Sequence, residues 1–237
     1  MSKGSLFLIP TYLSESNDAS FLAPMVLDII QNTNHYLVEN VRTARRFISS
    51  LNLGIEIPSL QFEILDKKST AAEVSKKMQW LNQGHDVGVI SEAGLPGLAD
   101  PGSLAIAFAH QNNFRVIPLP GATSIQTAVI SSGFSGQQYT FHGYLPIQKA
   151  DRVKAIKKLE QDLKSTGYTQ VFMETPFRNN QLLDDLMKNL NAQTRLSICV
   201  DVFGAKEYIK TQPIAEWKKS REDFHKIPAV FSIGHFS

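Results

Sequence analysis

The stretch from Asp86 to Ala122 constrains the fold of this chain more than any other part of the sequence. A short apolar run, Val87 to Ile90, leads into a loop that holds three glycines and two prolines. A helix-like segment follows, and a second apolar run ends in Pro-Leu-Pro-Gly at 118–121. This order predicts strand, loop, helix, strand and loop. In a parallel sheet both loops would follow the carboxyl ends of strands, where open α/β folds bind their ligands.

The glycines of these two loops support the same interpretation. Gly94, Gly97, Gly102 and Gly121 lack a Cβ, so the backbone can turn sharply or approach a flat ligand closely. By itself, such a loop is about as often a tight structural connection as a ligand site. The loop at 91–102 is longer than the ~2–6 residues of most βα connections, and a second glycine-containing loop accompanies it. We therefore expect a ligand at these loops.

Apolar runs alternate with amphipathic segments through the first half of the chain. Strands are expected at 5–9, 36–38, 60–65 and 87–90. Ser20 is expected to cap the first helix, and Thr70 with Glu73 to form a capping box before a later one. The alternation predicts a mostly parallel sheet that is covered by helices on both faces.

The second half of the chain predicts a mixed sheet, because its last strands follow one another closely. These strands are expected at 139–144, 169–173, 196–202, 207–210 and 229–233. The predicted fold class is therefore α/β, with two α/β domains. We place the boundary near Phe114, so that the domains comprise 1–113 and 114–237.

Composition excludes several classes of protein. Cys199 is the one cysteine, which excludes an intrachain disulfide and a cysteine zinc cluster, and it is expected to be a small buried hydrophobe. The six histidines show no pairing typical of metal ligands, so no metal is assigned. The net charge of +2 neither implies nor forbids a nucleic-acid partner. With no signal-peptide core and no apolar run long enough to cross a bilayer, a cytoplasmic protein without membrane association is expected.

Common catalytic motifs are missing from the sequence. There is no phosphate-binding P-loop, no G-x-G-x-x-G after the first strand and no G-x-S-x-G, which argues against ATP, NAD and serine-hydrolase chemistry. Chemistry that requires neither a metal nor a covalent nucleophile becomes the better explanation.

Several ordered motifs carry a resemblance that covers almost the whole chain. They are ENVRTARRF, SEAGLPGLADPG, PLPGATS, FHGYLP and ETPFR. In this spacing the chain resembles the tetrapyrrole (corrin/porphyrin) methylase family of S-adenosylmethionine-dependent enzymes. Its motifs are most similar to the branch that methylates a ribose 2′-hydroxyl in the 16S RNA of the small ribosomal subunit.

The resemblance implies a homodimer of two-domain chains, with S-adenosylmethionine folded in a cleft between the domains and held largely by backbone contacts. By position these contacts fall on Pro10, Gly94, Leu95, Pro96, Leu98, Ala122, Thr123 and Met173. The residues agree with this, because Gly/Pro loops can hydrogen-bond the edges of the cofactor, and Leu95, Leu98 and Met173 can form apolar walls. Methyl transfer is a direct displacement, so the protein mainly has to position the reactants.

Residues on the substrate side depart from the pattern of that branch. Where the branch carries Thr-Pro-Ile-Gly-Asn-Leu, this chain has PTYLSE at 10–15, and where it carries Arg-Glu-Leu-Thr-Lys, this chain has VDVFG at 200–204. The candidates for substrate contact are Glu39, Arg42, Glu174, Arg178 and Asp201. The structural alternative for Glu39 and Arg42 is an ordinary helix start with solvated arginines.

The sequence therefore predicts an S-adenosylmethionine-dependent methyltransferase that acts on a ribose 2′-hydroxyl of ribosomal RNA. One alternative is methylation of a tetrapyrrole or another small molecule. The other is a protein that binds the cofactor without catalysis. The exact acceptor atom, any general base and the effect of the two departures stay open at this level.

Overall fold

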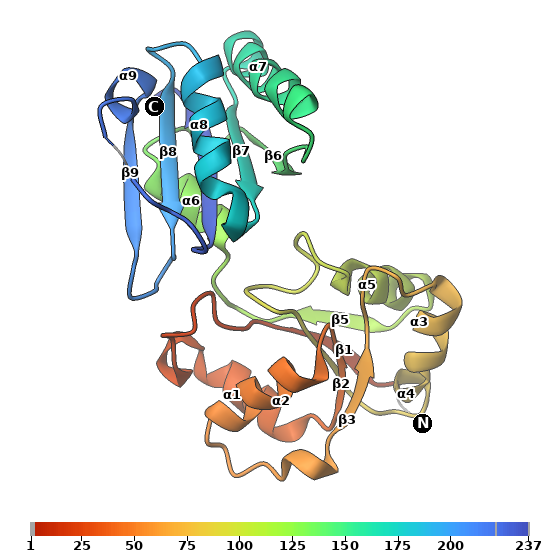
Figure 1. The fold of residues 1–237 in the computed structure, drawn as a ribbon. Coiled ribbons are helices and arrows are strands. Elements are labelled where there is room, and N and C mark those ends of the chain that lie inside the picture. Colours follow the sequence, from red (N-terminus) through yellow and green to blue (C-terminus); the bar gives the residue numbers. More distant parts are fainter. Residues whose placement is uncertain (1–2, 221, 237) are drawn as a thin grey trace. The chain divides into compact units, whose positions relative to one another are not determined.

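The computed structural model describes residues 3–220 and 222–236. The chain forms two compact units, one ending at Thr123 and the other beginning at Ser124 (Figure 1). Each unit combines one five-stranded sheet with helices, which confirms the predicted α/β class. The first unit includes the strand Arg115–Pro118, which the expected boundary near Phe114 assigned to the second domain, because this strand pairs with Ser5–Ile9.

The sheet of the first unit is parallel throughout, in the order β3-β2-β4-β1-β5. Its strands are β1 (Ser5–Ile9), β2 (His35–Val38), β3 (Gln61–Ile64), β4 (Val87–Ile90) and β5 (Arg115–Pro118). The helices of this unit are α1 (Pro24–Asn32), α2 (Val41–Ser50), α3 (Ala71–Lys77), α4 (Gln79–Asn82) and α5 (Gly102–Gln111), with short 3₁₀ turns η1 (Ala19–Phe21) and η2 (Ile57–Ser59).

Alternating side chains along the strands explain why helices cover both faces. Phe7 and Ile9 of β1 pack in one apolar cluster with Val26 of α1 and Ile48 of α2. Leu6, on the opposite face of the same strand, packs in a second cluster with side chains of α3, α4 and α5. Successive strand residues face opposite sides, so the apolar run Leu6 to Ile9 needs cover on both faces of the sheet.

The predicted start of the first helix at Ser20 is wrong. Ser20 lies in η1, whose N-cap is Asp18, and α1 begins only at Pro24. Proline disfavours helical backbone in the residue before it, and Ala23 is accordingly extended. The capping box at Thr70 and Glu73 is confirmed.

The sheet of the second unit is mixed, in the order β6-β7-β10-β8-β9, which confirms the sequence prediction. Its strands are β6 (Tyr139–Tyr144), β7 (Thr169–Glu174), β8 (Arg195–Val200), β9 (Tyr208–Pro213) and β10 (Ala229–Gly234). Only the β6–β7 pair among these is parallel. The helices are α6 (Ser124–Ser131), α7 (Lys149–Thr166), α8 (Asn179–Asn189) and α9 (Ile214–Trp217), and η3 (Pro176–Arg178) is a 3₁₀ turn.

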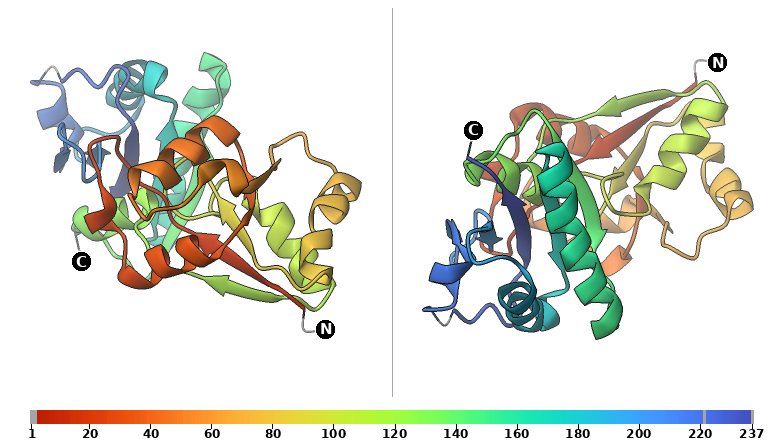
Figure 2. Two further views of the ribbon diagram at one scale, coloured as in Figure 1. Left: turned by 90° about the horizontal axis from the view of Figure 1, so that it is seen from below. Right: turned by 90° about the horizontal axis from the view of Figure 1, so that it is seen from above.

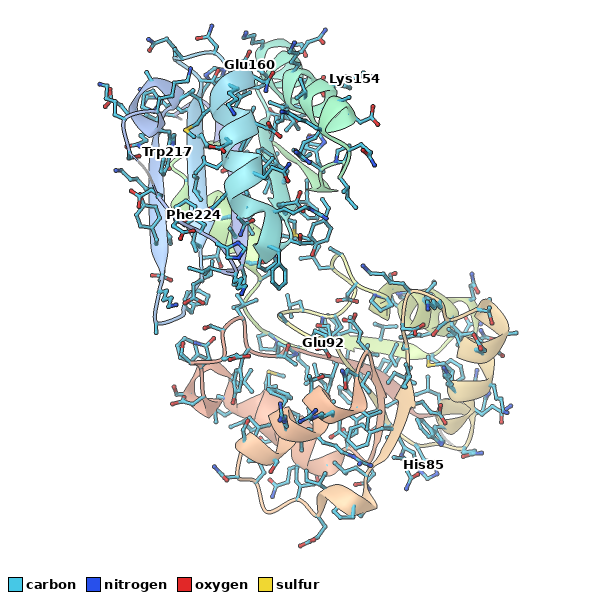
Figure 3. The ribbon with its side chains drawn as sticks, viewed as in Figure 1. His85, Glu92, Lys154, Glu160, Trp217 and Phe224 are labelled. Atoms are coloured by element: carbon cyan, nitrogen blue, oxygen red, sulfur yellow. The ribbon has the colours of Figure 1, made fainter. Side chains whose placement is uncertain are left out.

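Helices cover both faces of this sheet as well. In the right-hand view of Figure 2, α7 is the long blue-green helix that packs on β7 and β10, whereas α6 packs on β10 and β8. The indole N–H of Trp217, labelled in Figure 3, donates to the carbonyl of Leu196 at 2.9 Å within the core. Cys199 is buried as expected, and burial raises the pKa of its thiol to about 11.

Candidate functional site

The loops that follow β1, β4 and β5 meet at the carboxyl edge of the first sheet, because these three strands are neighbours in it. The amide of Thr11, just after β1, donates to the carbonyl of Gly94 at 2.9 Å. Its hydroxyl donates to the carbonyl of Ser91 at 3.3 Å. The glycine-rich loop after β4 is therefore tied directly to the loop after β1.

Two glycines are required for this close approach. A Cβ at Gly121 would lie only 2.3 Å from Cβ of Pro10 and 3.3 Å from a methyl carbon of Leu95. Gly94 has a φ of +74°, and a Cβ there would lie 3.4 Å from the carbonyl oxygen of Ala122. The structure thus brings Pro10, Gly94, Leu95 and Ala122 together, although they are far apart in the sequence.

Asp100 fixes the shape of the loop after β4. Its Oδ1 accepts hydrogen bonds from the amides of Gly97 at 2.9 Å and Gly102 at 2.6 Å, which bracket it in the sequence. Ala99 beside it has a φ of +65°, which few residues other than glycine adopt. Asp100 was not among the residues predicted from the sequence, although an acid between loop glycines is a usual signal for such a turn.

The remaining predicted cofactor residues have different surroundings. Pro96 and Thr123 are buried in the first unit, whereas Leu98 is 41% exposed on the same loop as Gly94. Met173 belongs to the second unit, where it pairs with Val230 in the sheet and is half-buried. The cofactor role of these residues and the cleft between the domains stay predictions.

A cavity of about 530 Å³ opens at the same edge of the first sheet, between the loops after β1 and β4 and the helix α2. We call it the α2 pocket. It is lined by side chains that include Tyr12, Thr43, Arg46, Phe47, Ser50 and Glu92. None of the predicted cofactor residues lines it.

Two glutamates lie beside this pocket. The amide of Glu92, labelled in Figure 3, donates to Oε1 of Glu39 at 3.2 Å, and the hydroxyl of Thr43 donates to Oε1 of Glu92 at 2.5 Å. Burial raises the pKa of Glu39, and the negative charges of Asp100 and Glu92 raise it further. Glu39 was predicted from the sequence and Glu92 was not, although Glu39 directly follows β2 and Glu92 is the second residue after β4.

Arg42 lies in the first turn of α2, which Asn40 caps by accepting from the amides of Arg42 and Thr43. The side chain of Arg42 is exposed, and within the described residues it makes no ion pair. Glu39 and Arg42 therefore both lie at the start of α2. An ordinary helix start with solvated arginines, the structural alternative to substrate contact, predicts the same position. What the structure adds is the pocket beside them.

Glu174 and Arg178 form an ion pair in the second unit. Nη2 of Arg178 donates to Oε1 of Glu174 at 2.5 Å, and this hydrogen bond raises the pKa of the guanidinium. The carboxylate is fully buried, and the amide of Thr175 donates to the same oxygen at 2.7 Å. The pair thus orders the loop that follows β7.

Asp201 stabilises the turn between β8 and β9. Its carboxylate accepts from the amide of Lys206 at 2.8 Å, its carbonyl accepts from the amide of Gly204 at 2.7 Å, and its own φ is +45°. Glu174 and Val200 both lie opposite Ala229, so Asp201 and Glu174 stand at the same edge of the second sheet. A contact of Asp201 with substrate stays a prediction.

Two absences concern the described part of the chain only. Residues 3–220 and 222–236 contain no group of three or more histidine, cysteine or acidic side chains that could hold a metal ion. Across these same residues, every helix is too short or too polar to span a membrane.

The fold defines a class of protein with two α/β units, in which glycine-containing loops lie at the carboxyl edge of the parallel sheet. The family described as Tetrapyrrole (Corrin/Porphyrin) Methylases matches residues 28–217, and the chain belongs to this family. The resemblance seen in the motifs is thereby confirmed.

Relatives in this family share moderate sequence identity with the chain. "Ribosomal RNA small subunit methyltransferase I" of Halalkalibacterium halodurans is 28% identical over 197 residues, which are 83% of this chain and 64% of that protein. The protein of the same name from Buchnera aphidicola subsp. Acyrthosiphon pisum is 25% identical over 236 residues, 98% of this chain and 79% of its own. The chain therefore spans somewhat less than two thirds of the first of these relatives.

Solved structures share the fold. The crystal structure of the methyltransferase CobJ superposes with a TM-score of 0.64 at 13% identity, covering 98% of this chain and 94% of that one. Uroporphyrin-III-C-methyltransferase from Thermus thermophilus gives a TM-score of 0.57 at 14% identity, with the same coverage.

Proposed function

We propose that this protein is an S-adenosylmethionine-dependent methyltransferase that methylates a ribose 2′-hydroxyl of ribosomal RNA. The observation that carries the proposal is the packing of Pro10, Gly94, Leu95 and Ala122 at one sheet edge in a member of the tetrapyrrole methylase family. The curated relatives named as ribosomal RNA small subunit methyltransferases favour RNA over a tetrapyrrole as the acceptor.

The residues at this edge fit the cofactor. S-adenosylmethionine supplies a methyl group activated by a positively charged sulfur. The loops after β4 and β5 have glycines where a Cβ would meet Pro10 or Ala122, so their backbones pack closely at this edge, as a site that holds the cofactor through backbone contacts requires. Asp100 stabilises one of these loops through two hydrogen bonds to its backbone, which supports catalysis by positioning.

The first test concerns cofactor binding and uses Ala122→Phe. A phenyl ring at this position should fill the site and weaken the binding of S-adenosylhomocysteine more than tenfold, about 1.4 kcal/mol or more, in calorimetry. Ala150→Phe, at an exposed position of α7, is the matched control and should leave affinity unchanged. Unchanged affinity in folded Ala122→Phe protein would place the cofactor elsewhere.

The second test identifies the acceptor. Protein and methyl-labelled S-adenosylmethionine are incubated with small ribosomal subunits from a strain that lacks the enzyme, and labelled nucleosides are then separated. Label on a 2′-O-methyl nucleoside supports the proposal. Label on an added tetrapyrrole, or cofactor binding without transfer to either acceptor, supports one of the two alternatives.

The third test concerns RNA affinity and the exposed Arg42. If this side chain contacts a phosphate, Arg42→Ala should flatten the slope of log K against log[salt] by about 0.7–0.9. Lys154→Ala is the control, because Lys154 is an exposed lysine on α7, in the second unit, and pairs with Asp151. Equal slopes for wild type and Arg42→Ala would remove Arg42 from the RNA interface. The homodimer and the cytoplasmic location stay predictions.

A further inference from the structure

We propose that exposed side chains at the carboxyl edge of β6 and β7 bind unpaired nucleotides of the RNA substrate by stacking. We call this surface the β7 platform, and it consists of Tyr144, Phe177, His225 and Lys226. The inference rests on the proposed function and adds an RNA contact within the second unit. Proteins that bind single-stranded RNA combine aromatic side chains, on which bases stack, with cations that contact the phosphates.

The ring of Phe177 is the centre of the platform and is 68% exposed. A single exposed apolar side chain is common on protein surfaces. This one, however, has an aromatic and a cationic neighbour. The ring centroids of Phe177 and His225 are 6.1 Å apart with planes at 78°, and Nζ of Lys226 lies 6.0 Å from the centroid of Phe177. The three side chains together offer a stacking face and a positive charge to one nucleotide.

Backbone hydrogen bonds join the two segments that carry these side chains. Phe177 lies in η3, where the amide of Arg178 donates to the carbonyl of Thr175 at 2.9 Å. The amide of Lys226 donates to the carbonyl of Pro176, also at 2.9 Å. A surface that is ordered before it binds loses less conformational entropy on binding.

The second segment of the platform is anchored to α8 at both ends. Phe224, labelled in Figure 3, is buried in the core, and its amide donates to Oδ1 of Asn180 at 2.9 Å. Nδ2 of Asn179 donates to the carbonyl of Ile227 at 2.6 Å. The two platform residues between these anchors have exposed side chains. The anchors therefore fix the backbone and leave both side chains open to a ligand.

Lys226 supplies an unpaired cation. Among the side chains that the structure describes it has no acidic partner, whereas Arg178 nearby is paired with the buried Glu174. The φ of Lys226 is +63°, a conformation that favours glycine, so the lysine side chain is not what stabilises this turn. An exposed ammonium group of this kind suits a phosphate of the RNA backbone.

A second exposed ring lies at the same edge of the sheet. Tyr144 ends β6, is 51% exposed and pairs with Met173 near the end of β7. Since β6 and β7 are parallel neighbours, the loops that follow them leave the same edge of the sheet. The platform therefore offers rings to more than one base.

The experiment measures the binding of a fluorescein-labelled RNA of about ten unpaired nucleotides by fluorescence anisotropy over a salt series. Phe177→Leu keeps an apolar side chain but loses the aromatic face, so affinity should fall at least about fivefold with the salt slope unchanged. Phe177→Tyr keeps the ring and should keep the affinity. Adding Tyr144→Leu to Phe177→Leu should weaken binding further.

Lys226→Gly tests the charge separately. It should flatten the slope of log K against log[salt] by about 0.7, the value for one phosphate contact on a single strand, and leave the Tm nearly unchanged. Phe236→Leu is the matched control for Phe177→Leu. Phe236 is an exposed phenylalanine at the opposite edge of the same sheet, and the guanidinium of Arg195 lies 4.1 Å from its ring centroid. This control should leave RNA affinity unchanged.

Three outcomes would overturn the assignment. Wild-type affinity and salt slope in folded Phe177→Leu and Lys226→Gly would exclude the platform from RNA contact. An equal loss of affinity in Phe236→Leu would show that the effect is not specific to this edge. Dissociation of Phe177→Leu into a smaller species in sedimentation would assign the surface to contact between copies of the chain.

The same variants distinguish this inference from the proposed function. If Phe177→Leu and Lys226→Gly lose RNA contact as expected but wild type transfers no methyl group to RNA, the proposed function fails and the platform stands. If wild type methylates ribosomal RNA and both variants bind RNA as wild type does, the platform fails and the proposed function stands.

Discussion

Replacing Gly121 by alanine tests whether the three loops at the sheet edge act as one unit. The added Cβ would lie 2.3 Å from Cβ of Pro10, whereas ordinary contacts begin near 3.4 Å. The two loops therefore have to separate by about 1 Å. Pro10 directly follows the buried β1, and its ring cannot rotate away as a flexible side chain would.

The expected cost follows from two opposing effects. Overpacking by one methyl group costs roughly 1–3 kcal/mol. An alanine that replaces glycine also restricts the unfolded chain, which stabilises the protein by about 0.4–1 kcal/mol where the backbone allows it. The net loss should be about 1–2 kcal/mol, or a fall in Tm of roughly 2–8 °C for a chain of this size.

Thermal unfolding followed by circular dichroism measures the loss of stability, and the rate of methyl transfer measures the loss of positioning. Since displacement of a positioning group by about 1 Å can lower the rate as much as a hundredfold, transfer should fall at least tenfold at saturating cofactor. Gly136→Ala is the control, because a Cβ there meets only Val129 at 3.6 Å. It should leave both quantities nearly unchanged. A Gly121→Ala protein with the Tm and the transfer rate of wild type would refute the packing argument.

Three further predictions concern ionisable groups. Asp185→Ala should lower the free energy of unfolding, measured in urea, by about 3–5 kcal/mol, because it leaves the buried Arg152 without the carboxylate that lies 2.7 Å away. The double variant Arg152→Met, Asp185→Leu should recover most of this loss. A small loss in Asp185→Ala would contradict the prediction. Burial raises the pKa of Glu39, so the stability that its protonated form confers is present below the unfolded-state pKa and is lost as pH rises through the folded-state pKa. The free energy of unfolding, measured between about pH 4 and 7, should therefore decline less with pH in Glu39→Gln than in wild type. The same pH dependence in both proteins would contradict the prediction. The thiol of Cys199 is buried and its pKa is raised to about 11. It should therefore react with a disulfide reagent only as fast as the protein unfolds. Rapid labelling of the native protein would contradict this burial.

Local patterns in the sequence were sufficient for most of the fold. The apolar run of β4, the capping box at Thr70 and the strand-helix alternation each depend on neighbouring residues, so they could be identified without tertiary information. Where local reasoning failed, a competing local rule decided the outcome. At the first helix the constraint before Pro24 prevailed over the capping tendency of Ser20.

The candidate site shows what sequence alone determined and what only the tertiary structure decided. The glycines of the two loops, and the glutamate after β2, were visible because strand ends and missing side chains leave marks in a sequence. That Gly121 packs on Pro10, and that the amide of Thr11 donates to the carbonyl of Gly94, depends on the order β3-β2-β4-β1-β5. This order brings together loops about eighty residues apart or more, as Thr11 and Ser91 show. No local pattern encodes such a neighbour, because it arises from how the strands pair in three dimensions.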